Sequence, residues 1–177
     1  MRRILAALIS ILGILPAAAQ TPDTAHAQAT ADLRAMVLRL SPEELGLSED
    51  TSPGPVWGLV METGMEGGYY TLVALADGTT SLYFSNGGGI LGGGEHAPVR
   101  KASGELLMSA NQFLESAAPA SSTPPPAQGH TTFYFLTFDG IRSYTAPEQE
   151  LGYQRDRLSP LFHAAHSVIS ELRVRTP

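Results

Sequence analysis

Residues 86–98 contain six glycines, together with Glu95 and His96, between an expected strand and an expected helix. Glycine lets backbone N–H groups turn toward a ligand, and the N-terminus of a helix adds positive partial charge. Arg100 and Lys101 fall in the first turn of the expected helix, where they oppose the helix macrodipole unless a negative group is bound. A small anionic ligand could therefore bind here. Its predicted binding residues are Asn86, Gly87, Gly88, Gly89, Gly92, Gly93, Gly94, His96 and Arg100.

Two nucleotide-binding motifs do not explain this segment. Gly87, Gly89 and Gly92 satisfy the dinucleotide-binding spacing G-x-G-x-x-G, but so many glycines make such a match nearly automatic. The βαβ unit that this motif requires is missing, and no Gly-Lys-Ser/Thr completes a phosphate loop. Two other interpretations stay open: a flexible or bulged loop that lets a strand edge pack closely, and a loop that contacts another protein.

Two histidines, His163 and His166, stand three residues apart on the last expected helix, a spacing at which they could share a metal ion. At about 100° per residue, however, His166 falls at the flank of the apolar stripe of that helix, and His163 falls on the opposite side. Glu95, His96 and His130 are further candidate ligands, but nothing in the sequence places them beside this pair. We therefore expect neither a metal ion nor a cofactor.

Catalytic side chains are sparse. The chain has no cysteine and no G-x-S-x-G motif, so the remaining candidate nucleophile is Ser85, with His96 or His130 as its base. Glu62 and Glu66 could form a pair of carboxylates, but we expect them near the turn between two strands, where solvated acids normally lie. The sequence therefore favours a non-enzymatic protein.

The N-terminus has the pattern of a secretory signal peptide. Arg2 and Arg3 supply positive charge, residues 4–16 are apolar, and small residues at 17–19 precede Gln20. The stretch is shorter than the roughly 20 residues of a membrane-spanning helix. We predict that residues 1–19 are removed and that the protein is secreted or periplasmic, with no membrane attachment after cleavage. The absence of cysteine excludes a lipid anchor at the cleavage site and any disulfide.

The charge balance limits the partners. Eleven basic and 17 acidic residues give a formal net charge of −6, which becomes about −8 when two arginines leave with the signal. An acidic domain repels phosphate backbones, so we expect no nucleic-acid partner. The expected partners are a second copy of the chain or another protein, with a small anionic ligand as the alternative.

Apolar periodicity and turn residues give the expected elements. A disordered leader at residues 20–27 precedes a single domain at residues 28–177. In order, the elements are a helix around 33–40, strands at 56–61, 69–75 and 79–84, a helix at 98–118, strands at 130–138 and 141–144, and a helix from 159 to about 172. Asp-Gly pairs at residues 77–78 and 139–140 predict hairpins. The proline-rich segment 119–128 is expected to form an internal loop.

The resulting order, α-βββ-α-ββ-α, predicts an α+β fold with a five-stranded antiparallel sheet covered by helices. This order resembles the roadblock, longin and profilin-like group of small α/β domains, over about residues 30–174. It departs from the roadblock order by placing three strands before the middle helix instead of two. Members of the group are mostly scaffolding, dimerising or ligand-sensing modules, so the resemblance implies an exported binding or protein-interaction domain and carries over no functional residue.

Overall fold

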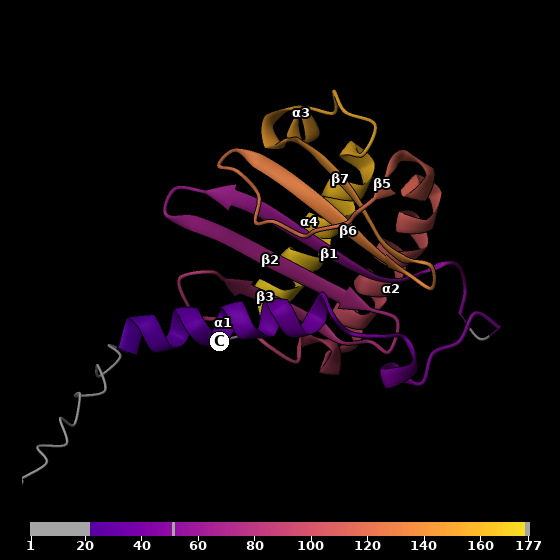
Figure 1. Ribbon diagram of the computed structural model, residues 1–177, viewed down its shortest axis with the longest axis horizontal. Helices are drawn as coiled ribbons and strands as arrows, with labels where there is room; N and C mark the ends of the chain where they lie inside the picture. Colours follow the sequence, from indigo (N-terminus) through magenta and orange to yellow (C-terminus); the bar gives the residue numbers. More distant parts are fainter. Residues whose placement is uncertain (1–21, 51, 176–177) are drawn as a thin grey trace, which may run out of the picture.

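The computed structural model describes residues 22–50 and 52–175 (Figure 1). The predicted signal peptide, residues 1–19, lies outside these described residues. None of the helices within them is both long and apolar enough to cross a membrane.

An antiparallel sheet of seven strands runs through the molecule, in the order β4-β3-β2-β1-β6-β7-β5 (Figure 1). Neighbouring strands pair antiparallel throughout this order. The strands are β1 (Val56–Met65), β2 (Gly68–Leu75), β3 (Thr80–Phe84), β4 (Gly89–Ile90), β5 (Ala118–Pro119), β6 (His130–Thr137) and β7 (Gly140–Pro147).

The expected five-stranded sheet is therefore wrong, because β4 and β5 extend its two edges. β4 lies inside the glycine-rich segment and pairs with β3, whereas β5 begins the proline-rich segment and pairs with β7. A strand of two residues is too short to show the alternation of apolar and polar residues that identifies a strand. An edge position also suits Pro119, which has no N–H to donate to a further strand.

The described residues contain four α-helices, whereas the sequence predicted three: α1 (Pro22–Val37), α2 (Ala97–Phe113), α3 (Glu148–Gly152) and α4 (Ser159–Arg175). The additional helix, α3, has five residues, too few for a recognisable apolar stripe. α1 begins at Pro22, so residues 22–27 of the expected leader lie in its first turns. Short 3-10 turns lie at η1 (Glu43–Leu45), η2 (Gly93–Glu95) and η3 (Leu114–Ser116).

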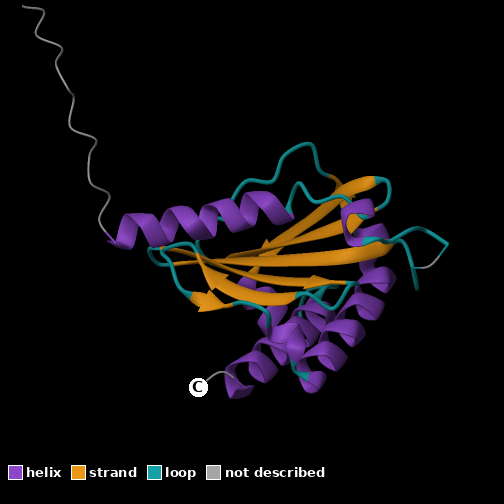
Figure 2. Cartoon of the chain, turned by 90° about the horizontal axis from the view of Figure 1, so that it is seen from below, coloured by secondary structure: helices purple, strands orange, loops and turns teal. Residues whose placement is uncertain are grey.

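Helices cover both faces of the sheet (Figure 2). α2 and α4 pack on one face, and α1 lies across the other. Because successive side chains of a strand point to opposite faces, the five longer strands contribute to both layers. The layer under α2 and α4 includes Leu59, Met61, Leu72, Phe133 and Phe135. The layer between α1 and the sheet includes Val37 from α1 and, from the strands, Trp57, Val60, Val73, Tyr83, Tyr134 and Leu136.

Both predicted Asp-Gly hairpins are confirmed. β2 pairs with β3 across Asp77-Gly78, and β6 pairs with β7 across Asp139-Gly140. The two glycines have positive φ, 94° and 113°, which an L side chain rarely adopts. The turn between β1 and β2 comes later than expected, because β1 continues to Met65. Glu62 consequently lies within a central strand and not in a turn.

Candidate functional site

Close packing accounts for four of the six glycines in the proposed ligand loop. A Cβ at these positions would overlap with His26 for Gly87, with Leu82 and Tyr83 for Gly89, with the Leu172 side chain for Gly93, and with the Gly78 carbonyl for Gly94. The other two, Gly88 and Gly92, have positive φ of 81° and 71° and open space around them. These contacts support the interpretation of a segment that packs closely at a strand edge.

Arg100 is bonded to the loop itself. Its Nη1 donates to the carbonyl oxygens of Gly94, at 2.6 Å, and Glu95, at 3.1 Å. The hollow beside it, about 290 Å³, is also lined by Asp77 and Glu95, whose carboxylates oppose the entry of an anion. His96 is the N-cap residue of α2 and its side chain makes no capping hydrogen bond.

The remaining predicted residues are dispersed. Gly88 and Gly89 line a different hollow, beside α1, and Asn86 is exposed. The Ser85 Oγ accepts a hydrogen bond from the backbone N–H of Tyr69 at 2.9 Å, and it contacts neither His96 nor His130 in the part of the chain that the structure describes. Among the described residues, no three His, Asp or Glu side chains gather as they would around a metal ion.

A groove that the sequence did not predict lies between α3, α4 and the strands β2 and β3. We call it the α3–α4 groove. It consists of two hollows that share Glu148 and His166. The outer hollow, about 420 Å³, is lined by Glu148, Gln149, Gly152, Tyr153, Phe162 and His166. The inner hollow, about 190 Å³, is lined by Tyr70, Leu82, Phe84, Glu148, His166, Ile169 and Arg173.

Aromatic rings form much of the lining. The rings of Phe162 and His166 lie 4.3 Å apart between centroids, and those of Tyr70 and Phe84 meet edge to face at 6.5 Å. Tyr153 is 64% exposed, which is unusual for a large aromatic side chain. The Arg155 guanidinium lies 4.9 Å from the centroid of this ring. The groove therefore offers flat apolar surfaces to a ligand.

His166 and Tyr70 supply neutral hydrogen-bonding groups at the junction of the two hollows. The His166 Nε2 lies 3.4 Å from the Tyr70 hydroxyl. Burial lowers the pKa of His166, and the electrostatic effects of His163 and Arg173 lower it further, which favours the neutral form of the ring. Burial also raises the pKa of Tyr70, which keeps its hydroxyl protonated.

Two side chains of opposite charge complete the groove. Glu148 comes from α3 and Arg173 from α4, and both line the inner hollow. Within the described residues, no hydrogen bond or ion pair engages the Glu148 carboxylate or the Arg173 guanidinium. The hydrogen bond between Glu148 and the Gly129 carbonyl uses the backbone N–H of Glu148 and leaves its carboxylate unbonded. Both charged groups are thus available to a ligand.

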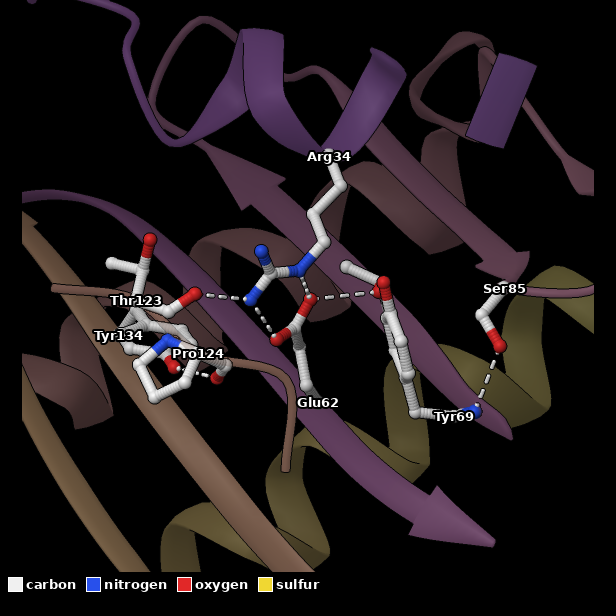
Figure 3. Close-up of polar contacts among 8 residues, drawn as sticks. Arg34, Glu62, Tyr69, Ser85, Thr123, Pro124 and Tyr134 are labelled. Atoms are coloured by element: carbon white, nitrogen blue, oxygen red, sulfur yellow. Dashed lines mark hydrogen bonds and ion pairs between the residues drawn. The ribbon is translucent and has the colours of Figure 1, made fainter. Parts of the chain in front are cut away.

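A second cluster of charged side chains lies under α1 (Figure 3). Arg34 donates through Nε to Glu62 Oε1 at 2.7 Å and through Nη2 to Oε2 at 2.8 Å. Its Nη2 also donates to the Thr123 carbonyl, and the Thr71 hydroxyl donates to Glu62 Oε1 at 3.0 Å. The Glu62 side chain is completely buried, so the expectation of a solvated acid at this position is wrong.

Tyrosines surround this ion pair. The Tyr69 ring lies 5.7 Å from the Arg34 guanidinium carbon, and the Tyr134 hydroxyl donates to the Pro124 carbonyl at 2.6 Å (Figure 3). Burial raises the pKa of Tyr134 to about 12, with the negative charge of Glu62 adding to the effect. Hydrogen bonds within the cluster connect α1, the sheet and the proline-rich segment. The cluster therefore stabilises the packing of these segments and does not form an open binding site.

Comparisons with protein-family models, with curated proteins and with solved structures found no match to this chain. Function is therefore inferred from the chain's own residues. The groove was missed because its lining comes from β2, β3, α3 and α4, whose packing no sequence spacing reveals. One feature of the sequence did point to the groove. The position of His166 around the helix axis places this histidine at the flank of the apolar stripe of α4.

Proposed function

We propose that this chain is an exported, non-enzymatic binding protein that takes a small organic ligand in the α3–α4 groove. The observation that carries the proposal is a preformed groove with aromatic walls and two charged groups without partners among the described residues. Its outer hollow, about 420 Å³, lies within the range of roughly 300–1,000 Å³ typical of small-molecule sites.

The lining supports binding more than catalysis. Its apolar surfaces come from Phe162 and Tyr153, and its neutral hydrogen-bonding groups come from His166 and Tyr70. Apolar walls with a few polar groups are typical of sites that orient a ligand. The residues that line the groove include no serine, threonine, cysteine or lysine to act as a nucleophile. Export is supported by the signal pattern of residues 1–19.

Two-dimensional NMR of the isotope-labelled mature protein tests the site. A panel of small aromatic and aliphatic compounds is added in turn, and the backbone resonances that shift are mapped onto the structure. We expect the shifts to cluster at α3, along α4 and around Tyr70, because a bound ring changes the local magnetic environment of these residues.

The variant Tyr153→Ser tests the same site by mutation, since it removes an exposed aromatic wall. Met108→Ser on α2 is the matched control, because Met108 is 65% exposed and lies outside the groove lining. We expect Tyr153→Ser to weaken binding and Met108→Ser to leave it unchanged. Shifts confined to residues 86–100 would instead support a ligand site at the glycine-rich segment, and an unshifted groove with every compound would overturn the proposal.

A further inference from the structure

The inner hollow combines an apolar floor with polar edges. Leu82 and Phe84 from β3 and Ile169 from α4 contribute apolar side chains, and Tyr70 adds a ring with a protonated hydroxyl. A ligand seated here would place an apolar group against these side chains, which removes that group from water.

The charges at this hollow have opposite signs and come from separate helices. The Arg173 guanidinium presents paired N–H donors that match the geometry of a carboxylate. The Glu148 carboxylate accepts hydrogen bonds from an ammonium group. A ligand with a single charge would leave one of these two groups paired with water alone. The hollow is therefore complementary to a molecule that carries both charges near an apolar group.

We infer that the α3–α4 groove binds small zwitterions with an apolar side group, the class that comprises free apolar amino acids and their short peptides. Arg173 holds the carboxylate, Glu148 holds the ammonium group, and the side group lies against Leu82, Phe84 and Ile169. The outer hollow, with Tyr153 and Phe162, accommodates the second residue of a peptide. This inference rests on the proposed binding function and adds the chemistry of the ligand.

Four probes that share one aromatic ring separate the contributions. Phenylalanine carries both charges, hydrocinnamate only the carboxylate, phenethylamine only the ammonium group, and phenethyl alcohol neither. NMR titration gives the affinity of each for the mature protein. Phenylalanine is expected to bind most tightly, and the loss of each charge to weaken binding about fivefold, since a partly exposed ion pair contributes at most about that factor.

Charge-removing variants assign each interaction to its residue. In Arg173→Gln, hydrocinnamate is expected to bind no more tightly than phenethyl alcohol. In Glu148→Gln, phenethylamine is expected to bind no more tightly than phenethyl alcohol. Arg157→Gln is the matched control, because Arg157 is an exposed arginine outside the groove lining. All three replace a charged side chain by the neutral side chain of glutamine, and an unchanged NMR spectrum away from the substitution verifies the fold.

The outcomes separate the ligand class from the binding function. Equal affinity of the four probes at the groove would overturn the zwitterion inference and leave the binding function in place. The same holds if phenylalanine binds most tightly but neither charge-removing variant changes its affinity. If none of the probes shifts the resonances of the groove residues, both the zwitterion inference and the proposed binding function are overturned.

Discussion

Arg34 of α1 and Glu62 of β1 form a bidentate ion pair beneath the helix, with both contacts shorter than 2.9 Å and the carboxylate completely buried. Burial alone would lower the pKa of Arg34, but the hydrogen bond and the charge of Glu62 raise it overall. Removing two charges from water is costly, so such a pair is stable only while both partners are present. Loss of either partner alone is therefore expected to weaken the packing of α1 on the sheet.

Replacing Arg34 by methionine should destabilise the protein strongly. Arg34→Met leaves Glu62 buried with the Thr71 hydroxyl as its remaining side-chain donor in the described structure. Loss of one partner of a buried pair costs about 3–5 kcal/mol in the free energy of unfolding. Equilibrium urea denaturation measures this change, and a loss below about 1 kcal/mol would show that the pair does not hold α1 to the sheet.

Two control variants distinguish charge burial from general damage. In the double variant Arg34→Met with Glu62→Leu, apolar side chains replace both charges, and most of the lost stability should return. Lys101→Met removes the exposed pair between Lys101 and Glu105, which are 3.8 Å apart. That change should alter stability by less than about 1 kcal/mol, because exposed ion pairs contribute little.

Alanine at Gly94 and at Gly104 should have opposite effects on stability. A Cβ at Gly94 would overlap with the Gly78 carbonyl in the turn between β2 and β3, and backbone atoms cannot easily move aside. Gly94→Ala should therefore cost about 1–3 kcal/mol. Gly104 lies inside α2 with open space around it, so Gly104→Ala should stabilise by up to about 1 kcal/mol. Thermal unfolding of both variants checks the prediction, and equal effects would contradict it.

The hairpins show what this sequence could predict. Asp77-Gly78 and Asp139-Gly140 identified two turns correctly, because the conformation of a tight turn depends on the residues inside it. β4 and β5 were missed because their identity as strands depends on pairing with β3 and β7, and not on a pattern of their own. Local chemistry was therefore sufficient for the turns and insufficient for the sheet edges.

The ion pair shows why the sites were harder to predict. Glu62 was expected near a turn, and Arg34, which lies 28 residues earlier, falls among apolar residues of the first helix. Only the packing of α1 across the sheet brings the two together. Likewise, Glu148 and Arg173 line the same hollow because α3 packs against α4. The sequence did not predict α3.

The pH dependence of His166 provides a further test. Its pKa is lowered in the folded protein, whereas the unfolded chain titrates near 6.5. The unfolded state thus binds more protons between the two pKa values. The contribution of His166 to stability is therefore fully present at a pH above the pKa of the unfolded chain. It is lost as the pH falls through the pKa of the folded protein. NMR titration of the imidazole resonances measures this pKa, and a value at or above 6.5 would contradict the prediction.

A neighbouring substitution should move the same pKa in a known direction. The charged and titratable groups near His166 are His163 and Arg173 on α4, Glu148 on α3 and Tyr70 on β2. His163→Gln removes one positive neighbour, so it should raise the pKa of His166 toward its ordinary value. Lys101→Gln, on α2, serves as a control and should leave it unchanged.

Removal of the predicted signal peptide should leave the whole of α1, as the structure describes it, in the mature protein. Cleavage between Ala19 and Gln20 would fall before Pro22, where α1 begins, so the exported protein would keep both Arg34 and Glu62. When the full chain is expressed in a Gram-negative host, mass spectrometry of the periplasmic fraction should give a protein that starts at Gln20. Ala19→Arg should block cleavage, because the protease requires a small residue there, whereas Gln20→Asn should not. Recovery of the wild-type chain from the cytoplasm with Arg2 and Arg3 intact would refute export.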